Sequence, residues 1–141
     1  MSAIRTQTEM SIMGTIFLSY RRALQKKLVP FGSTLKQHYV LQQLIKRERM
    51  QPSEIAEELY CDRPTASVVI RNLQKRGWIK KEKDPDNGKF FWVTITGKGR
   101  KQLEKTKGAL LPDIDPLSYL NADERKQLAV LLRKMRNGLM D

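Results

Sequence analysis

The chain has 141 residues, 40% of them hydrophobic and 30% charged, and a formal net charge of +12. This length suits one domain with an additional element, and the apolar content is sufficient for a core, which excludes a disordered tail. One cysteine excludes an intramolecular disulfide, and one cysteine with one histidine cannot form a usual zinc site, so we expect no metal or other cofactor.

The positive charge is concentrated in one part of the chain. Residues 62–107 contain thirteen lysines and arginines against five acids, which gives +8 (13 − 5) of the total +12. Such a concentration is typical of a nucleic-acid-binding surface, although a solvated basic face would show the same pattern. No apolar run approaches the length of a membrane span and no secretion signal is evident, so we expect a cytoplasmic protein with no membrane partner.

The first predicted helix covers residues 7–29. Its apolar residues, which include Ile12 and Ile16, recur at helical spacing, and Pro30 and Gly32 end it.

Two shorter helices follow. The first begins after a cap at Ser33 or Thr34. Its expected buried side consists of Leu35, Tyr39, Leu41, Leu44 and Ile45. The next begins at Pro52, which suits a first helical position because proline has no N–H to lose there, and Glu54 completes a capping box.

The fourth predicted helix begins after a cap at Asp62 and has two distinct sides. Its apolar stripe consists of Ala66, Val69, Ile70 and Leu73. The other side carries Pro64, Ser67, Val68, Arg71 and Lys75. Gly77 ends the helix, since glycine can turn the chain there without a Cβ penalty. Such a helix is anchored by one side and leaves the other side accessible.

A β-hairpin is predicted next, with strands at 78–83 and 89–95. An Asn-Gly pair between alternating residues is a strong hairpin signal. One face of the second strand carries Phe91, Val93 and Ile95, and the other face carries Phe90, Trp92 and Thr94. A fifth helix follows a cap at Thr96, and a last helix begins at a capping Asn121 after an irregular connection at 108–119.

Two short helices joined by a tight turn and followed by a hairpin make a winged helix-turn-helix. The predicted fold class is therefore mainly α with a small β-hairpin wing (α+β). In this motif the second helix enters the major groove of DNA and its N-terminal half meets the base edges. The tip of the hairpin can reach the adjacent minor groove.

Five segments of the chain follow a recognisable pattern: 51–59, 62–73, 75–79, 84–89 and 93–99. In these segments the chain resembles regulators of the multiple-antibiotic-resistance (MarR) family. The resemblance implies one MarR-like domain over 1–141, with a winged helix-turn-helix DNA-binding core at 34–107 and dimerisation helices at 1–32 and 108–141. It also implies control by a small-molecule effector, which the sequence does not identify.

The wing departs from the family pattern. The family usually has Asp-Arg-Arg in the wing, with an arginine that enters the minor groove, whereas this chain has Asn87, Gly88 and Lys89. The neutral Asn87 cannot make the usual Asp–Arg pair, and Lys89 attracts the groove as a point charge rather than as a planar fork. We expect the wing to contribute affinity with less shape selectivity.

The terminal helices are expected to form a homodimer. Ile12 and Ile16 in the first helix, and Leu131 and Met135 in the last, would expose apolar stripes if each helix were left alone. The resemblance implies a two-fold dimer on DNA. A dimer of this kind places its recognition helices about 34 Å apart, one turn of DNA, so the operator should be palindromic.

Most of the expected DNA contacts lie on the fourth helix. Arg71 either pairs bidentately with guanine or holds a phosphate, and both interpretations stay open. Contacts to phosphates or bases are expected from Arg63, Thr65 and Ser67. Pro64 and Val68 either touch a thymine methyl group or are simply exposed. The remaining expected contacts are Lys36, Gln37, Ser53, Lys75 and Lys89.

The other chemically distinctive residues have structural interpretations. We expect His38 to be an ordinary partly buried residue rather than a sensor, and Cys61 to be a small turn residue rather than an oxidant-sensing thiol. Trp78 and Trp92 are predicted to stack across the strands, with stacking on single-stranded bases as the alternative. No catalytic set or glycine-rich phosphate loop occurs in the sequence, so we do not expect an enzyme.

The sequence therefore predicts a sequence-specific, double-stranded-DNA-binding transcriptional regulator that represses from a palindromic operator as a homodimer. The alternative is a winged-helix interaction or architectural module that binds protein partners, or binds DNA non-specifically. A flat binding profile across DNA sequences, with steep salt dependence, would favour that alternative.

Overall fold

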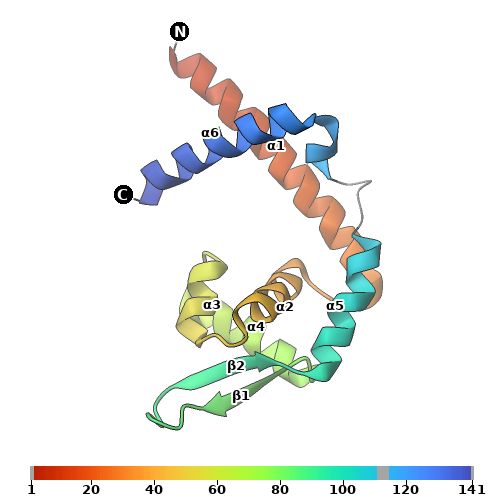
Figure 1. The fold of residues 1–141 in the computed structure, drawn as a ribbon, viewed down its shortest axis with the longest axis vertical. Helices are drawn as coiled ribbons and strands as arrows, with labels where there is room; N and C mark the ends of the chain where they lie inside the picture. Colours follow the sequence, from red (N-terminus) through yellow and green to blue (C-terminus); the bar gives the residue numbers. More distant parts are fainter. Residues whose placement is uncertain (1, 111–114, 141) are drawn as a thin grey trace. The chain divides into compact units, whose positions relative to one another are not determined.

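The computed structural model describes residues 2–110 and 115–140. The chain divides into two compact units (Figure 1), a central one at Arg21–Leu110 and a terminal one to which both ends of the chain contribute. The predicted irregular connection at 108–119 includes residues 111–114, which lie outside the described residues.

The terminal unit is built from helical segments. Helix α1 (Ser2–Leu28) begins in this unit and ends in the central one, and its first residues precede the predicted start at residue 7. The short 3-10 helix η3 (Pro116–Tyr119) leads into helix α6 (Ala122–Met140). Reciprocal bonds start α6, because Asn121 N–H donates to Glu124 Oε1 at 3.0 Å and Glu124 N–H donates to Asn121 Oδ1 at 2.9 Å. This is the predicted capping box.

The central unit contains the predicted helices and hairpin. After α1, the chain makes the 3-10 helix η1 (Val29–Phe31). The remaining elements are α2 (Leu35–Arg47), α3 (Pro52–Glu58), α4 (Arg63–Lys75), β1 (Ile79–Lys83), β2 (Phe91–Ile95) and α5 (Gly97–Ala109). The two strands pair antiparallel, with Ile79 opposite Ile95 and Lys83 opposite Phe91. The predicted fold class, mainly α with a β-hairpin, is confirmed.

The helices of this unit begin at the predicted caps. Thr34, Asp62 and Thr96 each accept a hydrogen bond from the backbone N–H three residues later, at 3.1, 2.7 and 3.1 Å. At the start of α3, Gln51 N–H donates to Glu54 Oε1 at 3.1 Å. These bonds satisfy donors at helix starts that no carbonyl within the helix can reach.

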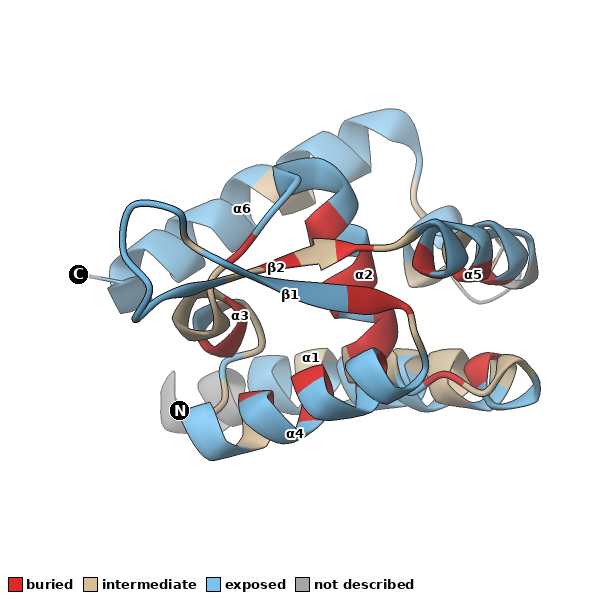
Figure 2. Ribbon diagram, turned by 90° about the horizontal axis from the view of Figure 1, so that it is seen from below, coloured by how far each residue is buried: buried red, intermediate tan, exposed pale blue. Residues whose placement is uncertain are grey.

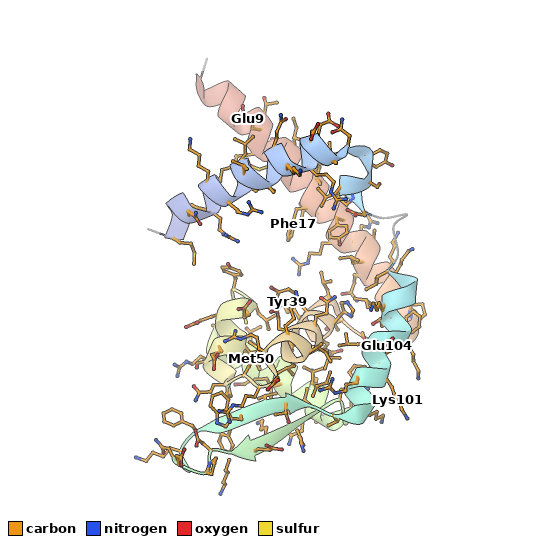
Figure 3. The ribbon with its side chains drawn as sticks, viewed as in Figure 1. Glu9, Phe17, Tyr39, Met50, Lys101 and Glu104 are labelled. Carbon is orange, nitrogen blue, oxygen red and sulfur yellow. The ribbon has the colours of Figure 1, made fainter. Side chains whose placement is uncertain are left out.

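One hydrophobic core joins α2, α3, α4 and the hairpin. Met50 is only 1% exposed, and its backbone bridges to Val93 of β2 with N–O distances of 3.1 and 2.8 Å. Figure 3 places the Met50 side chain among α2, α3 and the hairpin. Besides Met50 and Val93, the large fully buried side chains of this core are Leu41, Leu44, Ile55, Ile70 and Leu73. The bridge through Met50 attaches the hairpin to the helices at a point outside its own strand pairing.

The buried side of α2 differs from the prediction. Tyr39 and Ile45, which were expected inside, are 36% and 41% exposed, whereas Gln37 and His38 are buried. Both polar side chains have partners: Gln37 takes part in the α2 cap, and His38 Nδ1 lies 3.3 Å from Thr106 Oγ1 of α5. Polar groups with hydrogen-bond partners can be buried, and apolar periodicity does not reveal them.

The hairpin is confirmed, but its loop is longer than predicted. β2 begins at Phe91 rather than at residue 89. Residues 84–90 form two successive turns, in which Asn87 N–H donates to Asp84 O at 3.3 Å and Phe90 N–H donates to Asn87 O at 3.0 Å. These turns use residues that would otherwise have extended the strand pairing.

Gly99 allows α5 to approach the base of the hairpin. A Cβ atom on Gly99 would lie 2.2 Å from Trp78 O and 2.8 Å from Ile95 Cγ1. Thr96 N–H donates to the same Trp78 carbonyl at 3.0 Å. Because a backbone atom limits the space, no larger residue can be accommodated there without moving α5.

We therefore expect Gly99→Ala to lower the free energy of unfolding by about 1–3 kcal/mol, the usual cost of overpacking. Urea denaturation followed by circular dichroism would measure it. Gly97→Ala is the matched control, because a Cβ at Gly97 meets nothing within 4 Å. Equal midpoints for the two variants would contradict the close approach.

Candidate nucleic-acid interface

Helix α4 has one buried side and one exposed side (Figure 2). Its predicted apolar stripe, Ala66, Val69, Ile70 and Leu73, is at most 9% exposed. Its exposed side consists of Arg63, Pro64, Ser67, Val68, Arg71 and Lys75. The buried side holds the helix to the core. The exposed side presents cationic, hydroxyl and small apolar groups to a partner.

Asp62 organises the N-terminal end of α4. Its Oδ1 accepts a hydrogen bond from Thr65 N–H at 2.7 Å. Hydrogen bonds from the side chain and backbone of Thr65, with a smaller contribution from the charge of Lys36, hold the pKa of Asp62 below its ordinary value. Thr65 is half-buried, and its bonds to Asp62 use hydrogen-bonding capacity that a DNA contact would need.

The expected contacts on α2 and α3 do not all fit the structure. Lys36 and Ser53 are partly exposed in the first turns of their helices. Gln37 is 7% exposed, and its Oε1 accepts a hydrogen bond from Thr34 N–H at 3.1 Å. Burial and the cap argue against the expected phosphate contact of the Gln37 side chain, which stays a prediction.

Arg76 holds the C-terminal end of α4, a role that was not predicted from the sequence. Its Cζ lies 4.7 Å from the centroid of the Trp78 ring, and its Nη2 donates a hydrogen bond to Gly32 O. Between these two side chains, Gly77 turns the chain with a φ of 75°. The sequence did contain a signal for this contact. An arginine that precedes a tryptophan by two residues, with a glycine turn between them, can place its guanidinium over the indole ring.

Asp84 holds the hairpin loop. Its Oδ1 accepts a hydrogen bond from Asp86 N–H at 2.8 Å, and its Oδ2 accepts one from Trp92 Nε1 at 3.1 Å. Arg49, just before α3, lies over the same indole, with Cζ 4.0 Å from the ring centroid. The Trp92 side chain therefore connects the hairpin loop to β2 through Asp84, and connects β2 to the segment between α2 and α3 through Arg49.

The predicted stacking of the two tryptophans is wrong. Trp78 precedes β1 and is 4% exposed, whereas Trp92 lies opposite Glu82 farther along the hairpin. Each ring is covered by an arginine, Arg76 over Trp78 and Arg49 over Trp92. Burial also leaves Trp78 unable to serve as a platform for single-stranded bases.

Lys89 lies exposed in the hairpin loop. Its N–H donates to Asn87 Oδ1 at 3.2 Å, a side-chain turn typical of asparagine. Where the family usually has an acid–arginine pair, this chain orders its loop with Asn87 and with the Asp84 carboxylate described above. The Lys89 side chain remains available to a phosphate or to a groove.

His38 and Cys61 lie in structural settings. His38 is 6% exposed, and burial lowers its pKa below the ordinary value. Cys61 is half-buried and packs against the core, and its N–H donates to Ala56 O at 3.1 Å. Within residues 2–110 and 115–140, no group of three His, Cys, Asp or Glu side chains is arranged to hold a metal ion.

The terminal helices expose large apolar side chains. Ile12 and Ile16 of α1 are 54% and 47% exposed, and Leu131 and Met135 of α6 are 58% and 47% exposed. Each pair is four residues apart and therefore lies on one side of its helix. Among the described helices, none combines the length and hydropathy needed to cross a membrane.

Residues 33–90, which include α2 to α4 and most of the hairpin, match the family model for the MarR family. Over this segment the chain is similar to the MarR family. The resemblance noted in the sequence is confirmed.

Relatives and a solved structure extend this match. The HTH-type transcriptional regulator TtmR of Methylorubrum extorquens is 26% identical over 121 residues, which cover 86% of this chain and 62% of TtmR. The transcriptional repressor MprA of Escherichia coli is 30% identical over 94 residues, or 64% of this chain and 52% of MprA. This chain thus spans between 52% and 62% of the length of these two relatives.

The fold agrees with a crystal structure of a mutant MarR from E. coli complexed with operator DNA. The TM-score is 0.80 at 23% identity, with 89% of this chain and 91% of that chain covered. This likeness confirms the winged helix-turn-helix fold.

The cap at α4 predicts acid-dependent stability. The pKa of Asp62 is lower in the folded chain than its ordinary value of 3.8. The cap therefore stabilises the fold fully above the unfolded pKa, and this stabilisation is lost as the pH falls through the folded pKa. Asp62→Asn keeps a capping side chain that does not titrate. Between about pH 5 and pH 2.5, urea midpoints should fall farther for the wild type than for Asp62→Asn. If the urea midpoints of the two proteins fell equally with pH, the stabilising role of the Asp62 carboxylate would be contradicted.

Proposed function

We propose that this chain is a sequence-specific, double-stranded-DNA-binding transcriptional regulator that represses from a palindromic operator as a homodimer. The observation that carries the proposal is the exposed side of α4, which bears Arg63, Ser67, Arg71 and Lys75 while the apolar side is buried. These four residues are spaced by four and form one ridge along the helix. A helix that presents such a ridge can enter the major groove, where base edges carry the sequence-specific pattern of donors and acceptors.

Individual roles follow from residue chemistry. The Arg71 guanidinium can donate two hydrogen bonds to guanine O6 and N7, and Ser67 can donate to or accept from a base edge or a phosphate. Beside the ridge, Val68 is 47% exposed and can touch a thymine methyl group. Arg63 and Lys75 at the two ends of α4 suit the phosphates on either side of the groove.

The local charge supports a polyanionic partner. No acidic residue occurs between Asp62 and Glu82, a stretch that includes all of α4. The Asp62 carboxylate itself is engaged in the helix cap. Phosphates approaching α4 therefore meet cations with little opposing charge. The operator-bound MarR structure and the repressor MprA are both similar to this chain and support this assignment.

A second copy of the chain is the proposed partner of the exposed apolar sides of α1 and α6. Ile12, Ile16, Leu131 and Met135 are too exposed to contribute to a core within one chain. Their burial between two copies would remove apolar surface from water and would place two α4 helices on one operator. The family resemblance also implies a small-molecule effector, and this belongs to the proposal without a ligand class assigned.

Selection of bound sites from random duplexes at a fixed salt concentration should return a palindromic consensus. On that operator, Arg71→Ala should weaken binding by about 1–3 kcal/mol and relax the preference at one base position. Lys89→Ala is the contrasting control. It should weaken all sequences alike and reduce the slope of log K against log salt by about 0.9. If the wild type bound all duplex sequences equally, an architectural module would be favoured instead. If Arg71→Ala selected the same consensus as the wild type, the role of Arg71 as the base-reading residue would be refuted.

The dimer predicts that Leu131→Glu sediments as a species of 16.4 kDa, whereas the wild type sediments at twice that mass. A carboxylate buried in an apolar interface without a partner is costly, so the interface should not form. The variant should lose affinity for a palindrome and keep weak binding to a half-site. Arg133→Glu is the control, because position 133 lies on another side of α6. A dimeric Leu131→Glu would remove this interface from the proposal.

A further inference from the structure

We propose that Phe90, at the end of the hairpin loop, inserts as an apolar wedge between base pairs in the minor groove beside α4 and kinks the DNA. The inference rests on the proposed binding of double-stranded DNA. It goes beyond that proposal by assigning DNA deformation to one residue of the hairpin.

The hairpin exposes two adjacent phenylalanines. Phe90 is 49% exposed and Phe91 is 41% exposed. Large aromatic side chains usually bury their surface, because leaving it in water forgoes hydrophobic stabilisation. Two of them side by side on a structural hairpin therefore indicate a surface that is covered in a complex.

Phe90 occupies a fixed position. Its N–H donates to Asn87 O at 3.0 Å, and its carbonyl accepts a hydrogen bond from Asp84 N–H at 3.0 Å. Asp84 is in turn bonded to Trp92 Nε1, and Arg49 lies over that indole. A side chain on a backbone held in advance costs less conformational entropy to insert than one on a mobile loop.

The two phenylalanines differ in their surroundings. Phe91 pairs with Lys83 inside the strand register and alternates onto the same face as Val93, which is fully buried. Lys81 Nζ also lies 6.0 Å from the centroid of the Phe91 ring. Phe90 lies beyond the last strand pair, at the loop end of the hairpin. Because Phe90 lies outside the paired residues of β1 and β2, we assign insertion to Phe90, and Phe91 is assigned to the hairpin structure.

The charge around Phe90 fits a nucleic acid. Lys83 and Lys89 are exposed on either side of the loop. Two nearby acids have partners, since Glu82 pairs with Lys80 at 2.9 Å and the Asp84 carboxylate accepts two hydrogen bonds within the hairpin. The lysines can hold the phosphates that border a minor groove while an apolar group enters it.

The hairpin lacks the residue that usually reads a narrow minor groove. No arginine occurs in residues 77–99. Proteins that insert phenylalanine or another apolar side chain between base steps instead widen the groove and kink the duplex by about 20–90°. Such a mechanism favours flexible pyrimidine–purine steps, so the operator should carry a TA or CA step where the hairpin lies.

The test uses the full chain and the operator selected with it. A donor and an acceptor dye on the duplex ends report bending, and 2-aminopurine at successive positions outside each half-site reports unstacking. The wild type should bend the duplex and increase 2-aminopurine fluorescence at one step. Phe90→Ala should lose both signals and weaken binding by about tenfold or more, because an aromatic contact with a base is lost. Phe90→Leu should retain both signals, and Phe91→Ala should behave as the wild type.

Other outcomes would overturn the wedge. If the wild type binds the operator without bending or unstacking it, or if Phe90→Ala bends it as the wild type does, the wedge is refuted while sequence-specific binding stands. If Phe90→Ala and Phe91→Ala lost bending, unstacking and affinity equally, both phenylalanines would act by stabilising the hairpin, and the wedge would be refuted. A wild-type chain that binds no duplex overturns both proposals.

Discussion

Burial of the apolar side of α4 is the constraint on which the rest of the structure depends. A helix of 13 residues is marginal in water by itself, so tertiary packing has to maintain it. Ile70 and Leu73 are almost completely buried, and each such side chain contributes about 1.5–3 kcal/mol relative to exposure. The same packing sets the rotation of the helix about its axis. A different rotation would bury the Arg71 charge, so the exposed ridge is a direct consequence of the core.

The hairpin is positioned by contacts outside its own strands. An isolated two-stranded hairpin is marginally stable at best. Here Met50 bridges to Val93 on one side of the sheet, and Arg49 covers the indole of Trp92. At the other end, Gly99 lets α5 reach the carbonyl of Trp78. Two separate segments, residues 49–50 and α5, therefore fix the hairpin within the central unit, which allows its loop to present side chains at a defined position.

Two acidic residues of this basic region have structural roles. Asp62 caps α4, and Asp84 organises the hairpin loop while it accepts a hydrogen bond from Trp92. Carboxylates with such bonds hold local structure, and the lowered pKa of Asp62 keeps that carboxylate in its charged form. The net charge of +12 is therefore a coarse description of the surface. The local charge also depends on which carboxylates form hydrogen bonds within the fold.

Sequence alone determined the features that depend on neighbouring residues. The caps at Thr34 and Asp62 were predictable because a cap and its N–H lie three residues apart, and the two sides of α4 were predictable because one helical period is contained in a few residues. The tertiary structure alone decided that Gln37 is buried and that Trp92 meets Arg49. Those outcomes depend on which groups distant segments bring together, and neither periodicity nor spacing carries that information.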